Sequence, residues 1–274
     1  KRFNVECCPV VTPEIEKLFE PLHQLLNQIL ALGETVHIFI TEGADGLDLL
    51  LEGLRETFSQ ENITTLKDFA HAQPIQRLSF KVKTRTQVIV QTGTPHMLIA
   101  GHAVPISAFS FLQASSKSDQ VLSELVNAGI PEGARSVADL FCGRGTLSLP
   151  LAAKGLYVHA VECDSHALAA LRTIKQKGLT VEDRNLYDKP LTLEELNKFD
   201  AVVANPPRAG LGKQGISIAH SKTSNLVYVS CSLESFAKDA VMLQSYGFKL
   251  ETLTPVDQFL WTTHMELVAY FRRD

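Results

Sequence analysis

From Gln113 to the carboxyl end, short runs of strand-forming residues alternate with segments of helical pattern. This alternation is typical of βαβ units, in which parallel strands form a sheet that helices cover on both faces. Strands of this kind are expected at residues 136–141, 157–162, 180–185, 201–205 and 226–230. Helices are expected at residues 116–128, 146–153, 165–177, within 192–198 and at 233–246, and the stretch that ends at residue 221 is helical or looped.

Two further strand-like runs, residues 248–253 and 266–271, follow the last of these helices. The loop "TPVDQFLWTTHM" joins them, so they are expected to form an antiparallel hairpin at one edge of the sheet. The sequence therefore predicts an α/β fold with a seven-stranded sheet over residues 109–274.

The first 112 residues have a different pattern. A helix is expected at 13–32, a strand at 36–40, a helix at 48–58 and short strands from there to His102. This pattern predicts a smaller α+β domain over residues 1–108. In "RLSFKVKTRTQVIVQT" the basic side chains alternate onto one face of a strand, which indicates either a solvated edge strand or a small contact face for phosphates. These basic residues are Lys81, Lys83 and Arg85.

Composition excludes some classes of protein. The net charge is −4, with 9 basic against 12 acidic residues before Gln113 and 17 against 18 from there on. Neither part of the chain is broadly basic, which counts mildly against a nucleic-acid partner. No apolar run is long enough to span a bilayer and no leader resembles a signal peptide, so we expect a cytoplasmic protein with no membrane partner. The chain begins at Lys1 without an initiator methionine and is expected to be a fragment. Five cysteines without CxxC spacing are expected to be free thiols.

A glycine turn follows the first parallel strand in "DLFCGRGTLSLPLA". Gly143 and Gly145 let a ligand approach the backbone, and Glu162 at the end of the next strand is placed to bind the two hydroxyls of a ribose. The spacing of Asp139 from the two glycines resembles the first motif of class I S-adenosylmethionine-dependent methyltransferases. The alternative is that the glycines serve only a tight turn in another α/β protein.

Two later strand ends carry further polar groups. Asn205 precedes two prolines that stiffen its loop, as in methyltransferases that act on exocyclic nitrogens, but Arg208 stands where those enzymes carry an aromatic residue. Cys231 ends the strand at 226–230 and is expected to face the ligand crevice, which favours a functional thiol, whereas Cys142 and Cys163 are interpreted as inert core residues.

Taken together, these motifs resemble the RNA 5-methyluridine methyltransferases, whose bacterial members methylate uracil C5 in 23S ribosomal RNA or in transfer RNA. The matching segments are "FSFLQAS", "DLFCGRGTLSLPLA", "DRNLYD", "YVSCS" and "THMELV". The resemblance implies a Rossmann-like class I domain, S-adenosylmethionine as cofactor, an RNA substrate that is ribosomal rather than transfer RNA, and a monomer. It implies cofactor-site positions at Gln113, Phe141, Gly143, Gly145, Thr146, Glu162, Asn185 and Asn205.

The resemblance also implies a mechanism. Cys231 is the nucleophile that adds to uracil C6 and Glu266 removes the C5 proton, while Gln113 and Asn205 orient the ring. Two departures affect this reading, since Asn205 replaces an aspartate of the family and "SCSL" replaces "SCNP". An N-methyltransferase that uses Asn205, and an RNA-binding module with little activity, remain as alternatives.

Many members of the family carry a 4Fe–4S iron–sulfur cluster on four cysteines. "ECCPVV" resembles the segment with the fourth of these cysteines, which would be Cys8, but the other three do not occur in this chain. A cluster is therefore expected only in a longer form of the protein, and the alternative is that Cys7 and Cys8 are simply an exposed pair.

Overall fold

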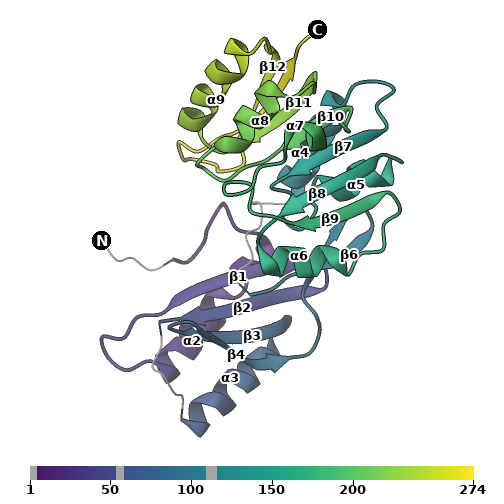
Figure 1. Ribbon diagram of the computed structural model, residues 1–274. Helices are drawn as coiled ribbons and strands as arrows, with labels where there is room; N and C mark the ends of the chain where they lie inside the picture. The colour runs from purple at the N-terminus through teal and green to yellow at the C-terminus, as the bar shows by residue number, and fades with distance from the viewer. Residues whose placement is uncertain (1–4, 54–58, 109–115) are drawn as a thin grey trace. The chain divides into compact units, whose positions relative to one another are not determined.

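A computed structural model describes residues 5–53, 59–108 and 116–274. The chain divides into two compact units, Lys1–Leu98 with Pro105–Ser110 and Ile99–Val104 with Phe111–Asp274 (Figure 1). Part of the boundary expected after residue 108 falls on residues 109–115, which lie outside the described residues. A two-stranded hairpin, β5 (His96–Ile99) and β6 (His102–Pro105), contains residues of both units.

The first unit is a four-stranded sheet in the order β1-β2-β3-β4, in which only β2 and β3 run parallel. The strands are β1 (His37–Gly43), β2 (Gly46–Glu52), β3 (Ile75–Val82) and β4 (Arg85–Gln91). The helices are α1 (Pro13–Glu16), α2 (Phe19–Ile29) and α3 (Gln60–Ala72). Leucines of α2, α3 and the sheet form one buried core, so the unit has the expected α+β character.

Three expectations for this unit were wrong in detail. The helix expected at 13–32 is divided into α1 and α2. The described part of the expected helix at 48–58 belongs to strand β2, and α3 lies where short strands were expected. Residues 47–51 (LDLLL) are all buried, and a fully buried strand lacks the alternation that would separate its sequence from that of a short buried helix.

The basic run also differs from the expectation. Lys81 lies in β3, Lys83 in the turn with φ +54°, and Arg85 begins β4, so the three residues belong to a hairpin and do not share one face of a single strand. The Lys81 Nζ atom forms an ion pair with Glu52 at 2.9 Å. This pair gives Lys81 a structural partner within the sheet.

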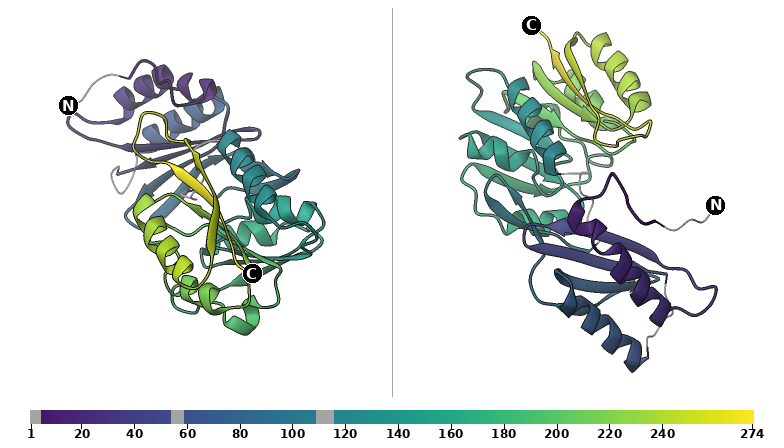
Figure 2. Two further views of the ribbon diagram at one scale, coloured as in Figure 1. Left: turned by 90° about the horizontal axis from the view of Figure 1, so that it is seen from above. Right: turned by 180° about the vertical axis from the view of Figure 1, so that it is seen from behind.

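The second unit contains the expected seven-stranded sheet, in the order β12-β13-β11-β10-β7-β8-β9 (Figures 1 and 2). The strands are β7 (Ser136–Leu140), β8 (Tyr157–Glu162), β9 (Leu179–Asp183), β10 (Ala201–Ala204), β11 (Asn225–Ser230), β12 (Lys249–Val256) and β13 (Glu266–Arg272). The first five are parallel, whereas β12 and β13 form an antiparallel hairpin beside β11. This topology confirms the fold class.

Helices cover both faces of this sheet, as the alternation predicted. They are α4 (Ser116–Gly129), α5 (Ser148–Ala153), α6 (Ser165–Arg172), α7 (Leu193–Leu196), α8 (Lys213–His220) and α9 (Leu233–Ser245). Successive strand residues face opposite cores: Val137 packs in the cluster that includes α4 and α5, and Ala138 in the cluster that includes α8 and α9. Among the described residues, no helix is long and apolar enough to cross a membrane.

Candidate active site

The site lies where the carboxyl ends of the parallel strands meet. Strand β7 continues to β8 and β9 on one side, while β10 and β11 lie on its other side. The order of the strands reverses between β7 and β10, and such a reversal opens a crevice that binds ligands in open α/β sheets. Gly143, Glu162, Asn205 and Cys231 all follow or end strands at this edge.

The turn after β7 is built from residues in the left-handed region. Phe141 has φ +60°, and Gly143 and Gly145 have φ +56° and +89°. A Cβ at Gly143 would meet nothing within 4 Å, so the space beside this residue is open to a ligand. At Gly145 a Cβ would lie 2.6 Å from Leu171 Cδ1, and this glycine therefore lets α6 pack closely against the turn.

Glu162 has its carboxylate fixed by backbone donors. Oε2 accepts a hydrogen bond from Gly143 N at 2.9 Å, and Oε1 accepts from Cys163 N at 2.7 Å and Asp164 N at 2.9 Å. Three charge-assisted bonds hold the half-buried carboxylate in one orientation. A carboxylate fixed next to an open glycine turn fits the ribose hydroxyls of a nucleoside.

Asp139 lies at the end of β7 and is completely buried. Ser148 Oγ donates to its Oδ2 at 2.5 Å, while Oδ1 has no hydrogen-bond partner among the described residues. Burial, opposed in part by the Ser148 hydrogen bond, raises the pKa of Asp139 to about 7. The site thus contains a buried carboxyl group that titrates near neutral pH.

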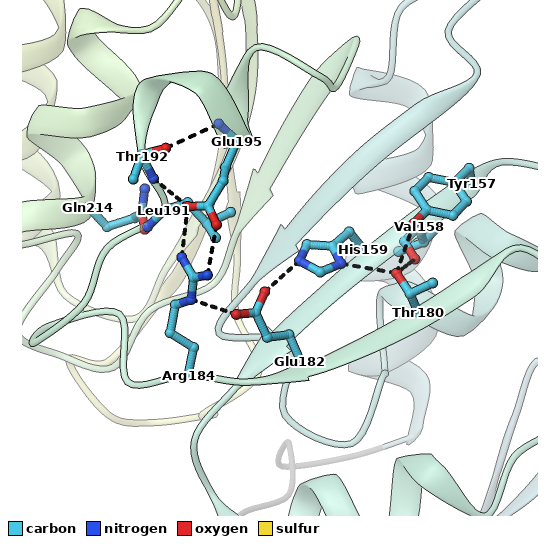
Figure 3. Close-up of polar contacts among 10 residues, drawn as sticks. All are labelled: Tyr157, Val158, His159, Thr180, Glu182, Arg184, Leu191, Thr192, Glu195 and Gln214. Atoms are coloured by element: carbon cyan, nitrogen blue, oxygen red, sulfur yellow. Dashed lines mark hydrogen bonds and ion pairs between the residues drawn. The ribbon is translucent and has the colours of Figure 1, made fainter.

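The loop after β9 begins at a network of charged residues (Figure 3). Arg184 donates two hydrogen bonds to Glu195 at 2.8 Å and one to Glu182 at 2.6 Å, while His159 contacts Glu182 at 2.9 Å. Glu195 also completes a capping box with Thr192 at the start of α7. These contacts fix the start of the loop against α7.

Asn185 follows Arg184 in the same loop and is exposed. Its Oδ1 accepts from Tyr187 N at 3.0 Å and its Nδ2 donates to Asp188 at 2.6 Å. The Tyr187 ring lies 5.4 Å from the Phe141 ring. The loop after β9 therefore contacts the turn after β7, as a site for one nucleoside requires.

Cys231 and Glu266 occupy corresponding positions on neighbouring strands. Cys231 directly follows Ser230, Glu266 directly precedes Leu267, and Ser230 pairs with Leu267 in the antiparallel ladder of β11 and β13. Burial raises the pKa of the Cys231 thiol, and the nearby Glu266 carboxylate raises it further, whereas Arg208 opposes both effects. A thiol and a carboxylate are thus brought together by strand pairing.

Glu266 is only 3% exposed. Gln258 Nε2 donates to its Oε1 at 2.9 Å, and its Oε2 has no hydrogen-bond partner in the part of the chain that the structure describes. Burial raises the pKa of this carboxyl group. A desolvated carboxylate with one unoccupied oxygen is suited to accept a proton.

Asn205 begins the loop after β10 and is half-buried. Its N–H donates to Leu140 O at 3.1 Å, which ties the loop to the end of β7. Farther along the loop, Arg208 Nη2 donates to His264 Nδ1 at 3.3 Å. The loop after β10 therefore contacts the loop that precedes Glu266.

The residues that support this loop cannot be recognised from the sequence pattern. Asp239 of α9 accepts hydrogen bonds from Leu211 N at 2.9 Å and from the Tyr228 hydroxyl at 2.6 Å, and the Tyr187 hydroxyl donates to Gly210 O at 2.9 Å. The only signal in the sequence is the tyrosine inside the apolar run "LVYVS", because a buried phenol needs a partner. Nothing in the sequence indicates that Asp239 is that partner.

The remaining predicted residues are less informative. Gln113 lies outside the described residues, and Thr146 is half-buried just before α5. Cys142 is buried, as expected for a core thiol, but Cys163 is exposed because it follows β8 at the open edge of the sheet, so its assignment to the core was wrong.

The amino-terminal cysteines do not form a site for an iron–sulfur cluster. Cys7 is exposed and Cys8 half-buried, and Cys8 N donates to Glu16 at 2.9 Å. No group of three metal-ligating side chains occurs among the described residues. The residues present do not fit the cluster, and nothing in the reaction proposed below depends on it.

Comparisons with known proteins match both motifs and fold. A family model for "tRNA (Uracil-5-)-methyltransferase" matches residues 182–274, and one for "Methyltransferase small domain" matches residues 108–223. An uncharacterized RNA methyltransferase of Brucella melitensis is 38% identical over 96% of this chain and 63% of its own length. One of Zymomonas mobilis is 33% identical over 97% of this chain and 67% of its own length.

Two further matches have more specific names. A 23S rRNA (uracil(1939)-C(5))-methyltransferase, RlmD, of Shewanella piezotolerans is 27% identical over 98% of this chain and 62% of its own length. The structure of a tRNA (uracil-54, C5)-methyltransferase of Pyrococcus abyssi, with S-adenosyl-L-homocysteine, has a TM-score of 0.78 and 20% identity, over 99% of this chain and 70% of that one. The chain spans slightly less than two thirds of the length of most of these curated relatives.

Proposed function

The chain belongs to the RNA uracil-C5 methyltransferase family, and we propose that it transfers a methyl group from S-adenosylmethionine to C5 of a uridine in RNA. The observation that supports this most strongly is the placement of Cys231 and Glu266 one residue beyond the pair Ser230 and Leu267. Methylation of uracil C5 needs both a nucleophile and a base, because C5 alone is a poor nucleophile.

In the proposed reaction the Cys231 thiolate adds to C6 of uracil, so that the electrons of the C5–C6 double bond move toward O4 and make C5 nucleophilic. When bound, S-adenosylmethionine would supply an electrophilic methyl group to that carbon, with the S–CH3 bond breaking and S-adenosylhomocysteine leaving. Glu266 then accepts the C5 proton, the C5–C6 double bond forms again, and the bond from sulfur to C6 breaks. The thiolate is released and the cysteine is ready for another cycle.

Residues at the glycine turn fit the cofactor. The open space at Gly143, the fixed carboxylate of Glu162 and the paired rings of Phe141 and Tyr187 are suited to a nucleoside. We assign Glu162 to the ribose hydroxyls and Asn185 to the adenine side. Gln113 and Asn205 are assigned to the uracil ring and the adjoining part of the cofactor.

Formation of the thiolate depends on the charges around Cys231. Burial and the Glu266 carboxylate raise the pKa of the thiol, while the Arg208 guanidinium favours the charged form. Arg208 therefore has the role of stabilising the thiolate before it attacks. A raised thiol pKa predicts that the rate of adduct formation increases with pH through the alkaline range.

We propose ribosomal RNA as the substrate rather than transfer RNA. The support is that RlmD of Shewanella piezotolerans, whose name specifies 23S rRNA, is similar in sequence over 98% of this chain. The match to the tRNA enzyme of Pyrococcus abyssi, at 20% identity, concerns the fold.

A covalent trap tests the proposal. RNA that contains 5-fluorouridine should form an adduct that survives denaturation, because fluorine at C5 cannot leave as a proton. The adduct should be lost in Cys231→Ser and retained in Cys7→Ser, which removes an exposed thiol of the other unit. Methylation that persists in Cys231→Ser would instead support an N-methyltransferase that uses Asn205, and failure to bind S-adenosylmethionine in calorimetry would support an RNA-binding module.

A further inference from the structure

The loop of residues 257–265, between β12 and β13, exposes apolar side chains at the edge where the site lies. Trp261 is the only tryptophan among the 274 residues, and it is 75% exposed. Leu260 and Met265 of the same loop are 48% and 36% exposed. Several large apolar side chains exposed in one short segment mark a surface that binds a partner.

Hydrogen bonds within the loop fix its shape. Thr262 donates from its N–H and from its hydroxyl to Phe259 O, at 3.1 and 2.8 Å, and His264 N donates to the Thr262 hydroxyl at 3.1 Å. The Phe259 ring meets the His264 ring edge-on at 6.3 Å. Trp261 has φ +61°, a conformation that is unfavourable for a side chain of this size. The loop therefore holds the indole in water at a cost in backbone strain.

The position of Trp261 connects it to the reaction. The loop starts after Val256 and ends at Glu266, and these two residues pair across the hairpin. The other large aromatic side chains that are exposed in the described part of this unit are Tyr157, which begins β8, and Tyr246, which precedes β12. Both lie near the amino ends of the parallel strands. Among the described residues of this unit, Trp261 is therefore the exposed large aromatic residue at the opposite edge, where the carboxyl ends of the strands and the site lie.

We infer that Trp261 stacks on an unpaired base of the RNA next to the target uridine. The inference rests on the proposed function. A uridine reaches a crevice at strand ends only when it leaves its stack, and the base beside it then loses a neighbour. An exposed indole can replace that neighbour, because every base presents a flat face to an aromatic ring.

Charge next to the loop favours RNA over an apolar partner. The Arg208 guanidinium contacts His264 of the loop, three residues from Trp261. A cation next to an exposed aromatic ring is the combination that binds a phosphate and the base attached to it. The occupant is therefore a nucleotide in a loop or bulge, not one within a duplex.

Fluorescence tests the contact directly, because Trp261 is the only indole in the chain. A stem–loop RNA with uridines in its loop should quench the emission of the 274-residue protein, and a fully paired duplex of similar composition should quench it much less. Equal quenching by both RNAs, or none by either, would overturn the inference.

Kinetics with ribosomal RNA from cells that lack the protein provide the second test. We expect Trp261→Leu to raise KM for RNA roughly five- to 100-fold, with little change in kcat or in cofactor affinity, and Trp261→Phe to recover most of the loss. Tyr157→Leu, which removes an aromatic side chain at the amino ends of the strands, is the matched control and should leave KM unchanged. An unchanged KM in Trp261→Leu refutes the stacking while the proposed function stands. A protein that transfers no methyl group, but whose emission is quenched by the stem–loop, refutes the function and retains the contact.

Discussion

Two carboxylates at the edge where the parallel strands end, Glu162 and Glu266, have opposite environments. Glu162 lies beside the glycine turn that we propose binds the cofactor, here named the cofactor end. It accepts three backbone hydrogen bonds and remains half-buried. Glu266 lies beside Cys231, at what we propose is the reaction end. It is 3% exposed and its Oε2 has no hydrogen-bond partner among the described residues. Backbone donors hold the carboxylate of Glu162 in place, whereas burial raises the pKa of Glu266.

This difference corresponds to two functions, ligand binding and proton transfer. A residue that binds a ligand benefits from a fixed orientation, which satisfied hydrogen bonds provide. A residue that accepts a proton benefits from desolvation and an unoccupied oxygen, and these cost stability. The comparison therefore predicts that substitutions at the cofactor end weaken binding, whereas substitutions at the reaction end slow turnover without weakening the fold.

The largest effect is expected for Glu266→Gln, which removes the proposed base. Turnover should fall by about 10²- to 10⁴-fold, and a covalent complex with ordinary RNA should accumulate because the C5 proton stays in place. Denaturing gels and methyl-transfer assays measure the two effects. Full turnover without a trapped complex would show that another group removes the proton.

Although Glu266→Gln should lower turnover, it should raise stability relative to the wild type as the pH rises. Because burial raises the pKa of Glu266, the folded wild type holds this proton more tightly than the unfolded chain and becomes less stable as pH rises through the raised pKa. The amide does not ionise. The difference in Tm between Glu266→Gln and the wild type should therefore be more favourable to the variant at pH 8 than at pH 5.

The second largest effect is expected at Asp139, which lies near the carboxyl end of β7. Unlike Glu162, it is completely buried, and its Oδ1 has no hydrogen-bond partner among the described residues. Its pKa is raised from 3.8 to about 7, so the wild type should lose roughly 3 kcal/mol of stability between pH 4 and pH 7 on account of this group. Asp139→Asn keeps an acceptor for Ser148 and should show a flatter dependence. Denaturant unfolding at pH 5 and pH 8 checks this, and parallel curves for both proteins would contradict it.

A moderate effect is expected for Glu162→Gln. The amide loses one of the acceptors for backbone N–H groups and the charge that strengthens these bonds, so the Kd for S-adenosylmethionine should rise by about 10- to 100-fold, while kcat at saturating cofactor changes little. Calorimetry measures the Kd. Glu124→Gln, an exposed position on α4, should bind as the wild type does. A large loss of kcat instead of affinity would break the comparison.

The smallest effect is expected for Arg184→Met in the network of Figure 3. The pairs are about a fifth to a third exposed, so the loss should be only about 1 kcal/mol, with a severalfold weaker cofactor affinity because the Asn185 loop loosens. The hydrogen bond from Arg184 lowers the pKa of Glu195 to about 2, so this stabilisation is present above the ordinary carboxyl pKa and disappears as pH falls toward 2.

The exposed pair of Lys238 and Glu234 provides the control for that prediction. Lys238→Met should leave the denaturant midpoint of unfolding close to that of the wild type, because an exposed ion pair contributes little to stability. If it destabilises the protein as much as Arg184→Met, then the network contributes no more than an ordinary surface ion pair.

Much of the second unit could be predicted from local sequence. Alternating strands and helices imply a parallel sheet, and in such a sheet every carboxyl end lies at one edge, which is why Glu162, Asn205 and Cys231 were correctly placed there. The first unit was predicted less well, because the buried run Leu47 to Leu51 has no period that separates a strand from a helix. Asp239 was missed because a hydrogen bond to a residue 28 positions away leaves no pattern in either segment. Gln258 was missed because the irregular loop that brings it to Glu266 has no period in its sequence.

The pairing of Ser230 with Leu267 has a further consequence. The strands β11 and β13 hold Cys231 and Glu266 independently of the tip of the loop at 259–264, which begins and ends on a closed hairpin. The tip can therefore change in length or sequence without moving the backbone at Cys231 and Glu266, provided that Gln258 and the contact between His264 and Arg208 are kept.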